Sequence, residues 1–163
     1  MITRYLTIVL LSASLASCGF HLRGSGPSTL NVSSVYVDAG GARKLGEEVS
    51  TQLSSMGVAL PGSAEEAEYT LKLSNEREDR KLLTVSADTG KVEEYELIYA
   101  ATMSVIGQDG KVLSEDQDVS ARRDLTFDEG AVVGKFEEER TMQEDLRRRV
   151  AANVLRRLNA VTR

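Results

Sequence analysis

The residue types that carry most enzyme chemistry are scarce in this chain. It has one Cys, Cys18, and one His, His21, both near the N-terminus. A disulfide needs two thiols, a zinc site usually needs three or four ligands, and a Ser or Cys nucleophile normally uses a His base. Because His21 lies outside any periodic segment, the sequence predicts neither a metal site nor a nucleophilic hydrolase.

Carboxylates occur in adjacent pairs, such as Glu47-Glu48, Glu65-Glu66 and Glu93-Glu94. Neighbouring residues of a strand point to opposite faces, so such pairs do not form general acid–base dyads. Gly24-Ser25-Gly26 lacks the third glycine and the preceding strand of a dinucleotide-binding loop. The sequence therefore predicts a protein that is not an enzyme and has no cofactor.

Two lysines are candidates for binding a phosphate group. Lys135 is expected in the loop 130–135 just before the last helix, away from helix-face partners. Lys91 is expected in the turn 88–91 between two strands. Each lysine could contact a phosphate or could be a solvated surface residue, and the sequence leaves both interpretations open.

A run of three arginines, 147–149, is a further basic feature. Three consecutive helical residues spread over about 200° of the helix circumference, so they cannot all face one ligand. Glu144 and Asp145 each precede one of these arginines, Arg148 and Arg149, by four residues. This spacing favours a solvated helix face whose charges pair with one another.

The first eighteen residues have the composition of a secretory signal. Arg4 precedes an apolar run from Leu6 to Leu15, and small residues lead to Cys18. About ten apolar residues are too few to cross a hydrocarbon layer of roughly 30 Å as a helix. The sequence Leu-Ala-Ser-Cys at 15–18 resembles the bacterial lipobox, whose Cys carries S-diacylglycerol and, after cleavage, an N-acyl group. An ordinary secretory signal with a coincidental Cys is the alternative.

We therefore expect a cleaved signal peptide over 1–17, a lipid anchor and flexible tether over 18–31, and a single domain over 32–163. Several acyl chains on Cys18 would hold the protein stably, at about 0.8 kcal/mol per buried CH₂ group. Gly19 stands where a signal for inner-membrane retention usually has Asp. The expected location is thus the inner leaflet of the outer membrane, facing the periplasm.

Composition limits the size of the fold and the kind of partner. The chain has 163 residues, of which 41% are hydrophobic, enough for one compact domain. It has 20 Lys and Arg against 25 Asp and Glu, and loss of Arg4 with the signal leaves 19 against 25, or a net charge of −6. Nucleic-acid binding depends on neutralising phosphates, so no nucleic-acid partner is expected.

Hydrophobic spacing predicts the first half of the domain. A strand is expected over 32–38, followed by a helix from Ala42 to Met56 with Gly57 as its left-handed terminal residue. A long strand, or two bulged halves, follows over 69–85. Its odd-numbered apolar register is expected to resume at Leu83 and Val85 after a charged middle section.

The second half is predicted to contain two more strands and a helix. Alternating apolar residues place the strands over 95–105 and 113–127, joined by the turn at 108–110. An apolar period of four predicts a last helix of about 24 residues that begins near Phe136. The expected fold class is α+β, a two-layer sandwich with both helices packed on one face of a four-stranded, mostly antiparallel sheet.

The first residues after the predicted cleavage site resemble a known family. Cys-Gly-Phe-His-Leu-Arg-Gly at 18–24 is similar to the signature that opens the mature LptE family of lipopolysaccharide-assembly lipoproteins. The similarity continues through the helix that ends at Gly57, the strand start at Glu94-Tyr95 and the Lys135 lead-in to the last helix. The family fold has two helices on one face of a four-stranded sheet.

This resemblance implies a non-enzymatic subunit that plugs the outer-membrane β-barrel LptD in a one-to-one complex. Such a subunit helps the barrel assemble and takes part in lipopolysaccharide transport to the cell surface. The resemblance also implies that lipopolysaccharide binds basic loop residues, one of which matches Lys135. A second family position falls here on Ala87 or Asp88, with Lys91 displaced to the far side of the turn.

Two other functions are compatible with the sequence. One is a free-standing periplasmic lipoprotein that binds another envelope lipid or polymer. The other is a lipid-anchored hydrolase that uses carboxylates alone, although the sequence offers no suitable carboxylate pair. A stable complex with a β-barrel would distinguish the plug from both.

Overall fold

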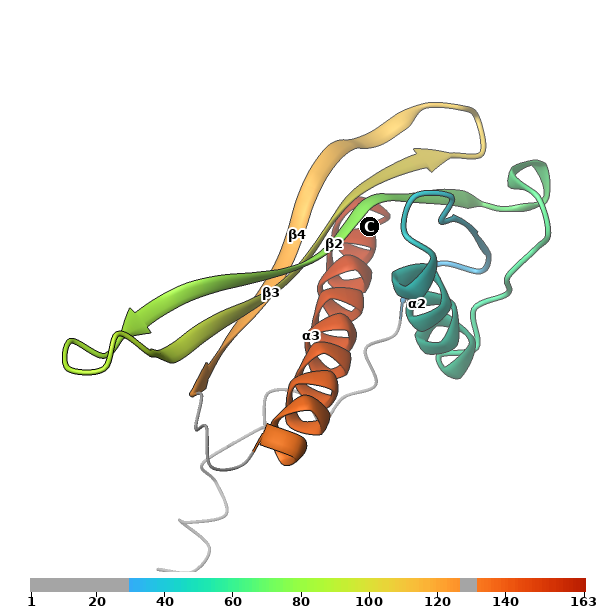
Figure 1. The fold of residues 1–163 in the computed structure, drawn as a ribbon. Helices are drawn as coiled ribbons and strands as arrows, with labels where there is room; N and C mark the ends of the chain where they lie inside the picture. The colour runs from blue at the N-terminus through green and yellow to red at the C-terminus, as the bar shows by residue number, and fades with distance from the viewer. Residues whose placement is uncertain (1–29, 127–131) are drawn as a thin grey trace, which may run out of the picture.

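The computed structural model describes residues 30–126 and 132–163, and Figure 1 shows their arrangement. In chain order the elements are β1 (Val35–Asp38), α2 (Arg43–Ser55), the 3₁₀ turn η1 (Ala64–Glu66), β2 (Tyr69–Val85), β3 (Val92–Gly107), β4 (Val112–Thr126) and α3 (Val132–Val161). The strands form one open sheet in the order β1-β2-β3-β4, in which only β1 and β2 are parallel. The predicted α+β fold class is confirmed.

Both helices pack on the same face of the sheet because they share one core with alternate residues of β3. The buried residues at the predicted spacings are Leu45, Val49 and Leu53 of α2, Leu146, Val150, Val154 and Leu158 of α3, and Leu97, Tyr99, Ala101, Met103 and Val105 of β3. Burial of each large apolar side chain contributes about 1.5–3 kcal/mol. This common stripe, more than helix propensity, holds α2 and α3 in place.

Two glycines fit α2 into this arrangement. Gly57, with φ of 80°, follows the helix in the left-handed conformation that the sequence predicted. Gly46 is buried in the first turn of α2, and a Cβ atom there would overlap the Cβ atom of Ala39. The absence of a side chain at Gly46 therefore lets α2 approach the end of β1 closely.

A bulge in β2 reverses which residues face the helices. Leu73 pairs with Met103, and Glu78 pairs with Tyr99, so an odd-numbered and an even-numbered residue of β2 share the helix-facing side. The extra residue lies between Ser74 and Arg77, where Asn75 has a left-handed φ of 52°. Of the two expected arrangements, the structure shows one continuous strand that contains a bulge.

The expected register beyond the bulge is wrong. Leu82, not Leu83, pairs opposite Tyr95, and a second irregularity follows at once. Leu83 and Val85 are exposed instead of continuing the core register. Each inserted residue shifts the side-chain alternation by one, which simple counting along the sequence cannot anticipate.

The first bulge also supplies the N-terminal cap of α2. Ala42 at the N-cap has no side-chain oxygen, and the carboxylate of Glu76 accepts hydrogen bonds from the backbone N–H groups of Lys44 (3.2 Å) and Leu45 (2.9 Å). The phenol of Tyr99 donates to the same carboxylate from within the core. Burial and the nearby negative charge of Glu76 raise the pKa of Tyr99 well above its usual value.

Several boundaries differ from the predicted ones. β1 begins three residues later than expected, and Ser34 before it forms an isolated bridge with Ala59. α3 begins at Val132, four residues before Phe136, and is 30 residues long. Phe127, predicted at the end of the last strand, lies outside the described residues.

Candidate functional site

The paired ends of β2 and β3 extend as a two-stranded arm beyond the rest of the sheet (Figure 1). β4 accompanies this arm only as far as Thr126, which pairs with Glu94. The residues from 80 to 95, the end of β4 and the first turns of α3 together form what we call the distal end. It contains both Lys91 and Lys135, which are more than forty positions apart in the sequence, but Figure 1 shows the turn of the arm well separated from the start of α3.

Exposed apolar side chains gather at the distal end. Among the described residues, seven large apolar side chains are exposed, and four of them, Leu82, Leu83, Val85 and Phe136, belong to this end. Their exposed fractions range from 42 to 69%. Scattered exposed apolar residues are ordinary, whereas a local concentration of them is typical of a surface that binds an apolar partner.

An ion pair connects the arm to α3. Arg80 Nη2 lies 3.0 Å from Glu139 Oε1, and the Arg80 guanidinium lies 5.2 Å from the centroid of the Tyr95 ring. Leu82 is two residues beyond Arg80 on the arm, and Phe136 is three residues before Glu139 on α3. Leu82 and Phe136 are therefore each within three residues of the ion pair that joins the arm to α3.

Lys91 lies in the turn of the arm, as predicted. The turn is closed by the backbone N–H of Ser86, which donates to the carbonyl of Lys91 at 2.8 Å, and by Gly90 with φ of 68°. The backbone N–H of Lys91 also donates to Thr89 Oγ1 at 3.4 Å. The turn therefore presents the exposed Lys91 side chain at the tip of the distal end.

Lys135 does not lie in a loop. It belongs to the first turn of α3, because that helix begins at Val132, and it immediately precedes the exposed Phe136. The Lys135 side chain itself lies outside the part of the structure that is described. The predicted lipidation residue Cys18 also falls outside the described residues, as do the predicted signal peptide and most of the tether.

The arginine run on α3 pairs in part with its own helix, although with different partners from those predicted. Arg148 pairs with Asp145 at 3.5 Å, and Glu144 pairs with Arg140 at 2.8 Å. Asp145 also lies 3.9 Å from Arg123 of β4. Arg148 thus belongs to a solvated helix face whose charges pair with one another. The distal end is therefore the better candidate for a binding surface.

The sequence did not single out the exposed apolar residues of the distal end. Its one signal was the pair Leu82-Leu83, because two adjacent large apolar residues break the alternation of a half-buried strand. Within residues 30–126 and 132–163, no cluster of three or more His, Cys, Asp or Glu could hold a metal ion. No helix in these same ranges is long and apolar enough to span a membrane.

Comparison with known proteins places this fold in a family. The model of the family LptE, described as lipopolysaccharide-assembly, matches residues 29–158. The solution structure of uncharacterized lipoprotein B from Nitrosomonas europaea is 25% identical, with a TM-score of 0.75 over 88% of this chain and 92% of that chain. No curated protein matches the chain.

Two crystal structures share the fold at lower identity. Rare lipoprotein B from Shewanella oneidensis is 23% identical, with a TM-score of 0.69 over 79% of this chain and 96% of that chain. A minor lipoprotein from Acinetobacter baumannii is 21% identical, with a TM-score of 0.64 over 80% and 93%. Because the family match runs from before β1 nearly to the end of α3, the chain belongs to the LptE family of lipopolysaccharide-assembly proteins.

Proposed function

We propose that this chain is a non-enzymatic, lipid-anchored subunit of the outer membrane that plugs the LptD β-barrel and takes part in lipopolysaccharide transport. Membership of the LptE family supports this role, and the lipoprotein names of the similar structures support the anchor. In this proposal residues 1–17 are removed, Cys18 carries the acyl groups, residues 18–31 link the anchor to the domain, and residues 32–163 form the plug.

We further propose that the distal end contacts lipopolysaccharide. Lipopolysaccharide combines acyl chains with phosphate groups, so a site for it needs apolar and cationic side chains close together. Two observations support such a site: Leu82, Leu83 and Val85 are exposed on the arm whose turn contains Lys91, and the exposed Phe136 directly follows Lys135 on α3, which the Arg80–Glu139 ion pair joins to the arm. The acidic net charge would not attract the ligand from a distance, so recognition would depend on these local contacts.

The first experiment tests the barrel partnership. The tagged full-length protein is purified from detergent-solubilised outer membranes, and mass spectrometry identifies what is recovered in near-equal amount. A β-barrel of the LptD type in a one-to-one ratio would support the plug. Recovery of the lipoprotein alone would contradict it and favour a free-standing binder of another envelope lipid or polymer.

The second experiment tests the ligand surface. Lys135→Asp should weaken binding of lipopolysaccharide to the purified protein about tenfold without lowering its melting temperature. The matched control is Lys111→Asp, which makes the same charge reversal in the exposed β3–β4 turn. Leu83→Ser should also weaken binding, whereas Leu60→Ser, another exposed leucine outside the distal end, should not. Equal effects of the paired variants would contradict this site.

A further inference from the structure

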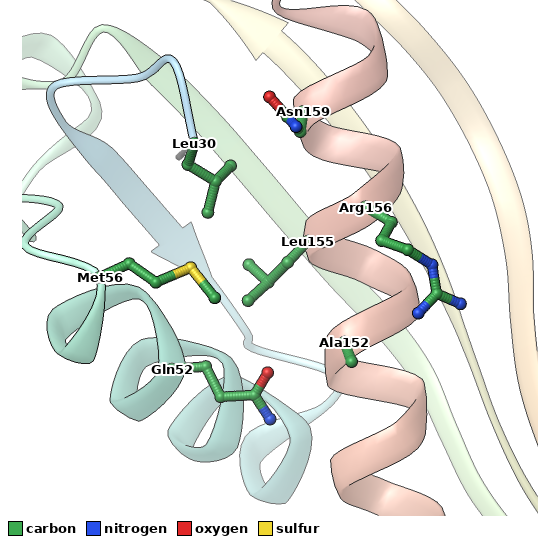
Figure 2. Close-up of a pocket in the computed structure, with 7 residues that line it drawn as sticks. All are labelled: Leu30, Gln52, Met56, Ala152, Leu155, Arg156 and Asn159. Carbon is green, nitrogen blue, oxygen red and sulfur yellow. The ribbon is translucent and has the colours of Figure 1, made fainter. Parts of the chain in front are cut away.

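A groove lies between α2 and α3, away from the distal end. Its volume is about 240 Å³, and its wall is mainly apolar. Figure 2 shows Gln52 of α2 and Met56, which follows that helix, on one side, and Ala152, Leu155 and Asn159 of α3 on the other. Met56 is exposed, so an apolar side chain that closes one wall of the groove remains uncovered by the described residues.

The described part of the chain begins in this groove. Leu30 is the first described residue, and its side chain points into the groove toward Met56 and Leu155 (Figure 2). Leu30 is partly buried and packs against the main core. The segment that precedes Leu30 therefore starts at the groove itself.

The groove wall also holds a hydrogen-bond acceptor without a donor. Asn159 Oδ1 is buried and has no hydrogen-bond partner within residues 30–126 and 132–163. A buried polar atom left unpaired destabilises the folded state. A backbone N–H from an extended segment in the groove would satisfy this oxygen, which an acyl chain could not do.

The preceding segment, 18–29, has side chains that suit the groove. Its large apolar residues are Phe20 and Leu22, and most of its other residues are Gly, Ser, Thr or Pro. The eight residue steps from Leu30 back to Leu22 can span about 26 Å when extended. The groove wall from Ala152 to Asn159 rises only about 10 Å along α3. The segment is thus long enough to reverse at Gly24 and Gly26 and return along the groove.

We propose that Phe20 and Leu22 pack into the groove between α2 and α3, so that the N-terminal segment straps the lipid-anchored residue to the helical layer. An unrestrained segment from Cys18 to Leu30 would reach about 40 Å. If Phe20 is docked, Cys18 can lie no more than two residue steps, about 7 Å, from the groove. The helix side of the domain is then held at the membrane surface instead of moving on a long tether.

Disulfide trapping tests this docking in the full-length protein. Phe20→Cys is combined with Met56→Cys, and intrachain bond formation under mild oxidation is followed by non-reducing gel and intact mass. The control pair combines Phe20→Cys with Asp124→Cys, an exposed residue of β4 paired with Glu96. Docking predicts that the Met56 pair closes at least tenfold faster. Equal rates for the two pairs would overturn the proposal.

A second measurement separates the two possible occupants. A photoreactive fatty acid is added to the wild-type chain and to a Phe20→Ser/Leu22→Ser variant, and labelled groove residues are identified by mass spectrometry. Docking predicts labelling of the groove in the variant and protection in the wild type. Equal labelling of both would overturn the proposal in favour of an acyl-chain ligand. Neither measurement depends on LptD, so the barrel proposal stands or fails separately.

Discussion

At the scale of single residues, Glu76 connects parts of the fold that are distant in sequence. Its backbone N–H donates to the carbonyl of Gly41 at 3.2 Å, and its carboxylate caps α2 and accepts the Tyr99 phenol. Tyr99 is only 1% exposed, so its hydroxyl depends on this partner. One side chain thereby fixes a helix terminus, a strand bulge and a polar atom in the core.

Glu76→Ala should lower the free energy of unfolding by about 2–4 kcal/mol, the sum of a lost helix cap and an unpaired buried hydroxyl. Urea unfolding followed by circular dichroism measures this change. The matched control is Glu78→Ala, which removes a neighbouring carboxylate paired with the exposed Lys44 and should cost less than about 1 kcal/mol. Similar losses for both variants would show that Glu76 acts only as a surface charge.

Tyr99 predicts a specific loss of stability in alkali. Burial raises its pKa in the folded chain above the unfolded value of about 10. The folded state therefore holds this proton more tightly, so its stabilising effect is complete below pH 10 and is lost as pH rises further, by up to about 1.4 kcal/mol per pH unit. Tyr99→Phe should be less stable near neutrality, and its stability should fall less steeply above pH 10.

Unfolding free energies between pH 8 and pH 11 test this pH dependence. The control is Tyr36→Phe, which changes a partly exposed tyrosine of the edge strand β1. If Tyr99→Phe loses stability above pH 10 as steeply as the wild type and Tyr36→Phe do, the buried phenol is not the source of the effect.

At the scale of elements, bulges and close approaches decide how the strands and helices fit. The β2 bulge turns Glu76 toward α2, and the second irregularity leaves Leu83 on the surface of the arm. Gly46 sets the approach of α2 to the end of β1. The apolar periodicity alone would also allow α2 to pack farther from β1. The bulge at Glu76 and the missing side chain at Gly46 therefore determine how closely α2 approaches the sheet.

Gly46→Ala should destabilise the domain by about 1–3 kcal/mol, because the added methyl group overlaps Ala39. Alanine improves helix propensity by up to about 1 kcal/mol, and overpacking outweighs this gain. Thermal and urea unfolding measure the net effect. Ala39→Gly in the same chain should restore much of the loss, and a double mutant no more stable than Gly46→Ala would rule out this contact as the cause.

At the scale of the whole molecule, the two surfaces proposed above lie on different parts of the domain. The distal end has exposed apolar side chains on the β2–β3 arm and on α3, and the groove between α2 and α3 contains Leu30, the first described residue. If the domain is anchored at one surface and binds lipopolysaccharide at another, as proposed, the two contacts do not compete for the same residues.

Cys18→Ala should abolish acylation and leave the signal peptide uncleaved, because the thiol is the expected attachment point. Incorporation of a labelled fatty acid and the intact mass of the product measure both effects. The control Ser17→Ala keeps a small residue before the thiol and should be labelled normally. Continued labelling of Cys18→Ala would place the acylated residue elsewhere in the chain.

Patterns along the chain were sufficient to predict the element order, the core stripes and the fold class. The spacing of Leu45, Val49 and Leu53, and the alternation along β3, depend on local backbone geometry, which a periodic pattern reports directly. The motif at 18–24 indicated the LptE family, and the family match over 29–158 confirms that membership from a different part of the chain. These features are local, so they can be recognised residue by residue.

Only the tertiary structure shows which residues make up the distal end and the groove. An inserted bulge residue changes the face of every residue after it, so the register of Leu83 and Val85 could not be counted from Tyr69. Leu82 is exposed as well, because the arm extends beyond the core. The cap from Glu76 to α2 and the entry of Leu30 beside Leu155 join segments that lie far apart in sequence. Such contacts depend on how helices and sheet meet in three dimensions, which no local pattern records.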